Sequence, residues 1–181
     1  MAKLIAKTYG GALFELAIEQ GKPEELLNEF AAVIDILRLF PDYNSLLNHP
    51  KILKEEKIEM MKNVLKGRVS SELTGFLELL IIKDRFRDTN AIYEQFAAMV
   101  KDYLGIGIAH VTTAFPMTEI QKSHIVESLL NVTEFKKMEM TYSVDEKLIG
   151  GMVIRIGDRI VDSSIATHLN NLKKQLLNIQ I

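Results

Sequence analysis

The chain has 181 residues, of which 48% are hydrophobic and 25% are charged, so it can bury a core and is not of the disordered class. Its net charge is −2 with both signs interspersed, which excludes the strongly basic surface of a nucleic-acid-binding protein. It contains no cysteine, which excludes disulfides, thiolate metal sites and cysteine nucleophiles.

Membrane signals are missing from the sequence. No segment approaches the roughly 20 consecutive apolar residues that a membrane-spanning helix needs, and the start of the chain lacks the apolar core of a signal peptide. We therefore expect any membrane association to be indirect, through partner proteins.

Helical periodicity dominates the first part of the chain. Apolar residues recur three and four positions apart, as on one face of a helix, and a shorter segment ends at Pro50. Gly21 and Gly105 follow helix ends, and Pro23 takes a first helical position. The pattern predicts an all-helical bundle with helices over 4–17, 23–40, 55–65, 71–82 and 89–104.

The period changes from helical to alternating after Gly105. Gly157 and Asp158 form a two-residue hairpin turn signal between the last two alternating segments. The sequence thus predicts two domains in an α + α/β fold, a helical domain at 1–105 and a smaller mixed domain at 106–181. The mixed domain is expected to hold a short sheet, with strands over 107–115, 138–144, 152–156 and 159–162.

Two helices are expected in the second domain. Thr118 and Gln121 have the capping-box spacing for a helix that runs to about residue 130. Ser163 or Ser164 can cap a final helix, whose apolar residues fall on one face: Ile165, Leu169, Leu172 and Leu176.

Gly105 and Gly107 resemble the start of a nucleotide-binding loop. The third glycine of that motif is absent, because His110 takes its place, and the pair precedes a strand where a dinucleotide loop follows one. A helix C-cap explains Gly105 better.

The sequence offers no catalytic constellation. Asp162, Ser163 and Ser164 lack the strand-turn-helix elbow of a serine nucleophile, and helix capping explains all three. A charge cluster between two helices is typical of a solvated turn: Asp84, Arg85, Arg87 and Asp88. The histidines do not share metal-ligand spacing: His49, His110, His124 and His168. We therefore expect no enzyme, no metal and no cofactor.

Gly150 and Gly151 allow two compatible interpretations. The first is a tight turn into the hairpin at a positive φ, which only glycine adopts without strain. The second is a close approach to the backbone of a partner.

Two of the expected helices carry two apolar stripes each. In the first helix one stripe is Ile5, Tyr9, Ala12 and Leu16, and the other is Ala6, Leu13 and Ala17. In the helix over 71–82 the stripes are Leu73, Phe76, Leu77 and Leu80, and Gly75, Leu79 and Ile82. Such helices either lie in the middle of a bundle or form a groove that receives an amphipathic partner helix.

Short motifs along nearly the whole chain resemble one family, the delta subunit of bacterial and chloroplast rotary ATP synthases, whose mitochondrial relative is the oligomycin-sensitivity-conferring protein. The opening helix resembles that of the family through Ala6, Tyr9, Ala12, Leu13, Phe14 and Ala17. The second domain does so through Val144-Asp145, Leu148-Ile149-Gly150-Gly151, Ile156-Gly157-Asp158 and Asp162 with Ser164.

The resemblance implies a non-catalytic stator subunit that links the catalytic head to the peripheral stalk, so that the head resists rotor torque. It implies an N-terminal six-helix bundle that binds the N-terminal helix of an alpha subunit, and a C-terminal domain that binds the C-terminal end of the stalk b subunit. It places the complex at the cytoplasmic face of a bacterial cell membrane, with no cofactor and no nucleic acid.

Carried over by motif, the residues at the alpha-subunit site are Tyr9, Ala12, Gly75 and Leu79. The motif of the C-terminal domain comprises Gly150, Gly151 and Asp162. The alternative functions are a helical adaptor and a nucleotide-binding regulatory protein.

Overall fold

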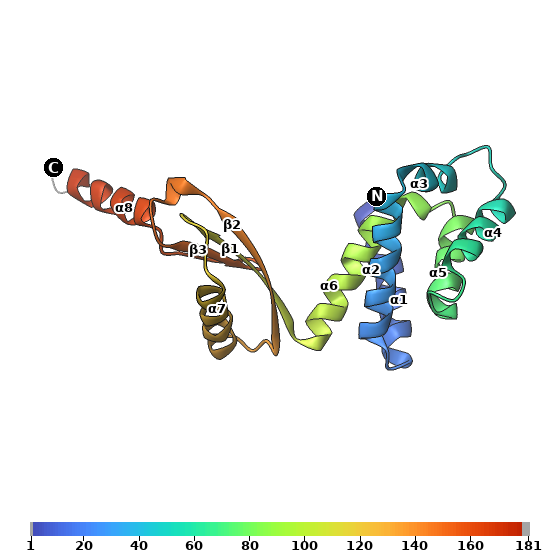
Figure 1. The fold of residues 1–181 in the computed structure, drawn as a ribbon, viewed down its shortest axis with the longest axis horizontal. Helices are drawn as coiled ribbons and strands as arrows, with labels where there is room; N and C mark the ends of the chain where they lie inside the picture. Colours follow the sequence, from blue (N-terminus) through green and yellow to red (C-terminus); the bar gives the residue numbers. More distant parts are fainter. Residues whose placement is uncertain (1, 179–181) are drawn as a thin grey trace. The chain divides into compact units, whose positions relative to one another are not determined.

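The computed structural model describes residues 2–178 (Figure 1). Its internal contacts divide the chain into two compact units that meet in the sequence between Val100 and Lys101. The expected division at residue 105 marks the end of helix α6, Thr89–Leu104. The last turn of this helix is grouped with the second unit because its side chains reach that unit: Lys101 Nζ lies 2.6 Å from Glu139 Oε2.

The first unit is entirely helical. Its elements are α1 (Ala2–Glu19), α2 (Pro23–Leu39), α3 (Pro41–Leu47), α4 (Lys54–Leu65), α5 (Ser71–Ile82), the 3₁₀ helix η1 (Phe86–Asp88) and most of α6. Pro23 opens α2 with Glu24 and Glu25 in its first turn, where acidic side chains favour the positive end of the helix dipole. Ser70 caps α5, since its hydroxyl accepts the Leu73 N–H at 3.4 Å.

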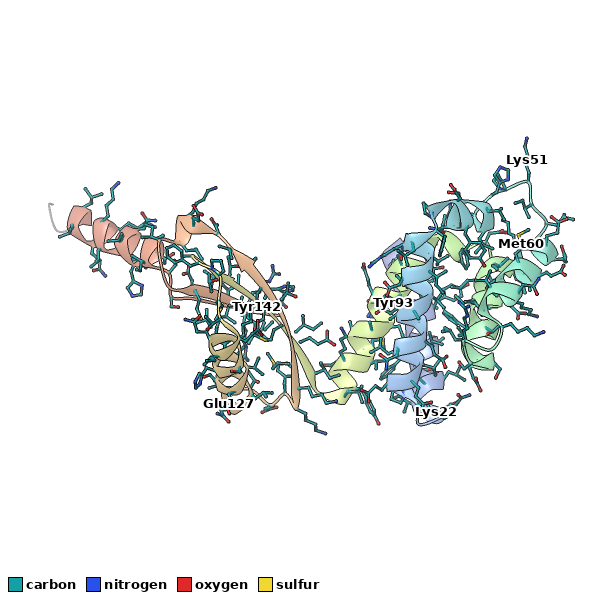
Figure 2. The ribbon with its side chains drawn as sticks, viewed as in Figure 1. Lys22, Lys51, Met60, Tyr93, Glu127 and Tyr142 are labelled. Atoms are coloured by element: carbon teal, nitrogen blue, oxygen red, sulfur yellow. The ribbon has the colours of Figure 1, made fainter. Side chains whose placement is uncertain are left out.

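Aromatic rings lie in the core of the first unit. Phe30 of α2 is fully buried, and the Tyr93 ring of α6 meets it edge-on with centroids 5.3 Å apart (Figure 2). Phe76 and Phe96 lie 6.2 and 6.1 Å from the same ring. These contacts join α2, α5 and α6 around one apolar centre, which aromatic edge contacts stabilise beyond the area they bury.

The second unit is a small α/β fold. Its elements are β1 (Ile106–Thr113), α7 (Glu119–Val132), β2 (Lys137–Val144), the 3₁₀ helix η2 (Glu146–Leu148), β3 (Met152–Ile156), β4 (Arg159–Asp162) and α8 (Ile165–Asn178). The sheet is four-stranded with the order β2-β1-β3-β4. β1 and β2 are parallel and joined through α7, whereas β3 pairs antiparallel with both β1 and β4. The chain is thus mostly helical with a small mixed sheet, in agreement with the predicted fold class.

One face of the sheet carries the core of the second unit. In β1, alternate residues from Gly107 to Thr113 are buried, while Ile108 and His110 on the other face are exposed. Helix α7 packs on β2, where Lys122 Nζ lies 5.1 Å from the centroid of the Tyr142 ring. The predicted capping box begins α7: the Gln121 N–H donates to Thr118 Oγ1, and the Thr118 N–H donates to Gln121 Oε1.

Neither the length nor the composition of any helix within residues 2–178 is sufficient for crossing a bilayer.

Candidate partner-binding surfaces

Helix α1 buries only one of its two apolar stripes within the first unit. Ala6, Leu13 and Ala17 are buried. On the other stripe Ala12 is exposed, and Ile5, Tyr9 and Leu16 are half-buried. The interpretation of α1 as a central helix covered on all sides therefore does not apply within this unit.

Helix α5 shows the same division. Its core stripe is buried: Leu73, Phe76, Leu77 and Leu80. Leu79 and Ile82 on the second stripe keep 41% and 49% of their surface exposed. Gly75 is also exposed, and a Cβ atom added to it would meet nothing within 4 Å.

The two uncovered stripes lie on neighbouring helices. Gln20 Nε2 donates to Glu72 Oε1 at 3.4 Å, which joins the end of α1 to the start of α5, and α1 also contacts η1, which follows α5. The two helices therefore run in opposite directions. Gln20 continues the Ala12–Leu16 row, and Glu72 begins the Gly75–Leu79 row, because helical neighbours three and four positions apart share a face.

The hydrogen bond thus connects the polar ends of two apolar rows. We call these rows together the α1–α5 face: Ile5, Tyr9, Ala12, Leu16, Gly75, Leu79 and Ile82. It contains every residue that the sequence assigned to the alpha-subunit site.

Gly150 and Gly151 hold the second unit together from within. Gly151 has a φ of +75°, and a Cβ atom there would lie 2.2 Å from the Ser163 carbonyl oxygen. The Gly150 carbonyl accepts the Ile165 N–H at 3.0 Å. The turn interpretation therefore explains both glycines, and the backbone that approaches Gly151 closely belongs to this chain.

Asp162 caps the start of α8, as the sequence suggested. Its Oδ1 accepts the Ser164 N–H at 2.8 Å, and its Oδ2 accepts the Thr167 hydroxyl at 2.8 Å. The Ser164 backbone N–H first, and then the Ser164 and Thr167 hydroxyls, hold the pKa of Asp162 below its ordinary value. Ser164 is fully buried and its Oγ accepts the Thr167 N–H at 3.2 Å, so these groups have a structural use.

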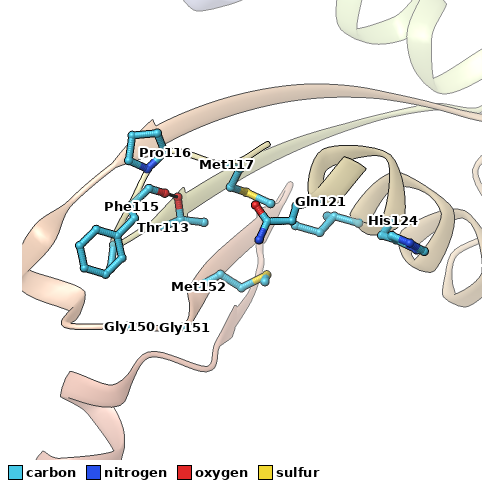
Figure 3. A pocket seen from close by; sticks show the side chains of 11 residues that line it. Thr113, Phe115, Pro116, Met117, Gln121, His124, Gly150, Gly151 and Met152 are labelled. Atoms are coloured by element: carbon cyan, nitrogen blue, oxygen red, sulfur yellow. Dashed lines mark hydrogen bonds between the residues drawn. The ribbon is translucent and has the colours of Figure 1, made fainter. Parts of the chain in front are cut away.

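Two further features of the second unit were not singled out as sites from the sequence. The apolar residues of α8 stay exposed, a row visible in the sequence whose lack of cover is not: Ile165, Leu169, Leu172 and Leu176. A cavity of about 410 Å³ opens between the end of β1, α7 and the glycine pair. Met117 and Met152 lie on opposite sides of this cavity in Figure 3.

Similarity to known proteins decides what these surfaces belong to. A family model described as the ATP synthase delta (OSCP) subunit matches residues 5–176. The chain belongs to this family. The ATP synthase subunit delta of Lachnoclostridium phytofermentans is 44% identical over 181 residues, with 100% of both chains covered. That of Alkaliphilus metalliredigens is 32% identical, with 99% of both chains covered.

A solved structure shares the fold. A chain of the mitochondrial ATP synthase hexamer of Toxoplasma gondii covers 95% of this chain and 97% of its own length, with a TM-score of 0.72 and 19% identity.

Membership in the delta/OSCP family gives the function in outline. The chain is a structural subunit of ATP synthase, a stator subunit linked to the peripheral stalk, and it is not catalytic. The predicted stator function is thereby confirmed. Among residues 2–178, no group of three His, Cys, Asp or Glu side chains is placed to hold a metal ion.

Proposed function

We propose that the α1–α5 face binds the amphipathic N-terminal helix of an alpha subunit in the catalytic head. The second unit would hold the C-terminal end of the b subunit of the peripheral stalk. The first unit acts in this proposal as the six-helix bundle of the family, and the complex lies at the cytoplasmic face of a bacterial cell membrane. The observation that carries the proposal is the pair of uncovered apolar rows on α1 and α5.

The chemistry of the face suits a helix better than an extended peptide. Ala12 and Gly75 have no bulky side chain, so the backbone of a partner helix can approach closely. Tyr9, Leu79 and Ile82 then contact its apolar side chains at helical spacing. Covering the exposed part of Leu79 contributes about 1 kcal/mol, from the usual transfer energy of a leucine side chain.

A static joint also fits the mechanical task. Rotation of the central shaft exerts torque on the head, and a stator must resist it without dissociating. Apolar burial supplies a lasting contact that needs no chemical step.

Isothermal titration with a synthetic peptide of the alpha-subunit N-terminus from the same organism tests the proposal. We expect one-to-one binding, with the peptide becoming helical by circular dichroism. Ala12→Asp and Leu79→Asp should each weaken binding by about 100-fold or more, because a carboxylate would be buried against apolar side chains. Both proteins should stay folded, since the two positions are exposed.

Leu39→Asp provides the matched control, since Leu39 is an exposed leucine of α2 outside the α1–α5 face. Its binding should equal that of the unchanged protein. Equal binding by Leu79→Asp would show that the alpha helix docks elsewhere.

A further inference from the structure

A polar cavity of about 220 Å³ lies in the first unit, away from the residues of the α1–α5 face. It is formed where the loop between α3 and α4, the first turns of α4, the end of α5 and η1 come together. Its polar lining consists of Asn48, Lys57, Asp84 and Arg87. The turn that the sequence alone describes as a solvated charge cluster thus forms one wall of a cavity, and α4 forms another.

Lys57 is the unusual residue of this cavity. It keeps only 8% of its surface exposed, although lysine is almost never buried without a partner. No hydrogen bond or ion pair is recorded for its ammonium group, or for the guanidinium group of Arg87, among the residues that the structure describes. Removing an ammonium group from water without a hydrogen-bonding partner costs free energy.

Asp84 is the acidic group of the cavity, and it is bonded directly by another lysine. Lys54 Nζ lies 2.7 Å from Asp84 Oδ2 and donates to the Ile82 carbonyl at 2.6 Å. The hydrogen bond from Lys54, and then the charges of Lys54, Lys57 and Arg85, hold the pKa of Asp84 below its ordinary value. Asp84 therefore stays ionised beside Lys54, and the lining carries more positive than negative charge.

Backbone geometry fixes this wall of the cavity. Asp84 has a φ of +55°, its N–H donates to the Ile81 carbonyl, and the Arg85 N–H donates to the Leu80 carbonyl. This pair of bonds is the Schellman ending of a helix, where glycine is usual. Arg87 follows directly in η1, so its position beside Lys57 is set by the way α5 ends.

We infer that this cavity is a binding site for a single phosphate group, which Lys57 and Arg87 contact as hydrogen-bond donors. A phosphate group fits within the volume, and an ammonium and a guanidinium group are the side chains that bind phosphate most strongly. The volume is too small for the base and sugar of a nucleotide as well. The source of the group is therefore either free inorganic phosphate or the phosphate end of a larger molecule.

Nuclear magnetic resonance titration of the full chain with inorganic phosphate tests the inference. The titration is run at constant ionic strength against chloride. We expect saturable shifts of backbone amide signals confined to Asn48, Lys57, Asp84 and Arg87, with a Kd of about 1 mM, as for a small ligand held by two charge-assisted contacts. Lys57→Met and Arg87→Met should each raise this Kd at least tenfold.

Two variants guard against a change in folding. Arg87 is exposed, so Arg87→Met should keep the fold even if Lys57→Met does not. Lys51→Met is the control, because Lys51 is an exposed lysine of the same loop that does not line the cavity. Its Kd should equal that of the unchanged protein.

ADP and adenosine distinguish the source of the phosphate. Shifts at the same amides with ADP at lower concentration than with phosphate identify a nucleotide, and weaker shifts identify free phosphate; adenosine alone should have no effect. Linear, unsaturated shifts, or equal binding by Arg87→Met and the unchanged protein, would overturn the inference. The alpha-helix proposal is unaffected either way, because it depends on a different face.

Discussion

At the scale of single residues, Gly151 has the least freedom to change. Its φ of +75° strains any residue with a Cβ atom, and that atom would lie 2.2 Å from the Ser163 carbonyl oxygen. We expect Gly151→Ala to destabilise the second unit by at least about 2 kcal/mol. Gly157→Ala is the control, because Gly157 has a φ of +55° with open space around it; its cost should be about 1 kcal/mol. Urea unfolding followed at amides of the sheet measures both.

Gly150 separates folding from stalk binding. An added Cβ would lie 2.6 Å from Ile165 Cδ1, the far end of a flexible side chain. Gly150→Ala should therefore keep the sheet folded but displace the start of α8. If the glycine pair shapes the contact with the stalk, this variant binds the b subunit more weakly than the unchanged protein. A Gly150→Ala protein that still joins stalk and head would refute that part of the proposal.

Asp162 gives the second unit a pH dependence. Its folded pKa lies below the ordinary aspartate value of about 4 because the ionised carboxylate accepts the Ser164 N–H and the Thr167 hydroxyl. A lowered folded pKa means that this stabilisation is fully present above about pH 4 and is lost as the pH falls through the lowered value. We expect amide exchange in the first turn of α8 to rise over that acidic range.

In Asp162→Asn the acidic rise in exchange should be absent, because asparagine carries no titrating group. Exchange in α8 that rises equally in both proteins would assign the effect to other groups.

At the scale of elements, Ser70 connects two helices. Its hydroxyl accepts the Leu73 N–H of α5, and its N–H and hydroxyl donate to Glu29 Oε2 of α2 at 3.0 and 2.5 Å. We expect Ser70→Ala to lower the free energy of unfolding by about 1–2 kcal/mol, since it removes an N-cap and leaves a half-buried carboxylate with one donor fewer. Ser71→Ala, which changes the next, exposed serine, should cost less than half as much in the same thermal or urea measurement.

Local signals predicted most of the elements. The capping box at Thr118 and Gln121, the N-cap at Ser70 and the hairpin turn at Gly157 are short-range features, and the structure has all three. The parallel pairing of β1 with β2 and the strand order were not predicted, because they depend on contacts between distant parts of the chain. The short helix η2 was missed as well, since its residues lack a periodic pattern.

The surfaces show the same limit. The two stripes of α1 and α5 are readable from spacing, but a central helix has the same pattern, so only the exposure of Ala12 and Leu79 shows which stripe is left uncovered. The cavity around Lys57 could not be predicted, since Lys57 precedes the charged turn at Asp84 by more than two helices' worth of spacing. Its burial depends on how α4 packs against α5.

At the scale of the whole molecule, the proposed function requires that both units belong to one chain. Two binding sites on one chain join two partners because each bound partner holds the other at a high effective concentration. Gly105 lies between the end of α6 and the start of β1, so a protease recognition sequence inserted after Gly105 gives a way to cut the covalent connection without changing any residue of the α1–α5 face or of the glycine pair.

We expect cleavage at this insertion, in a complex assembled beforehand, to leave ATP hydrolysis by the head intact while ATP-driven proton pumping falls to a small fraction of its uncut value. The physical reason is that an uncoupled head turns with the rotor and the torque no longer reaches the membrane part. Proton pumping into membrane vesicles, measured beside ATP hydrolysis before and after protease treatment, gives the ratio directly. The same complex with an uncleavable insertion controls for the added residues. Pumping that persists after complete cleavage would mean that the torque is carried by a connection other than this chain.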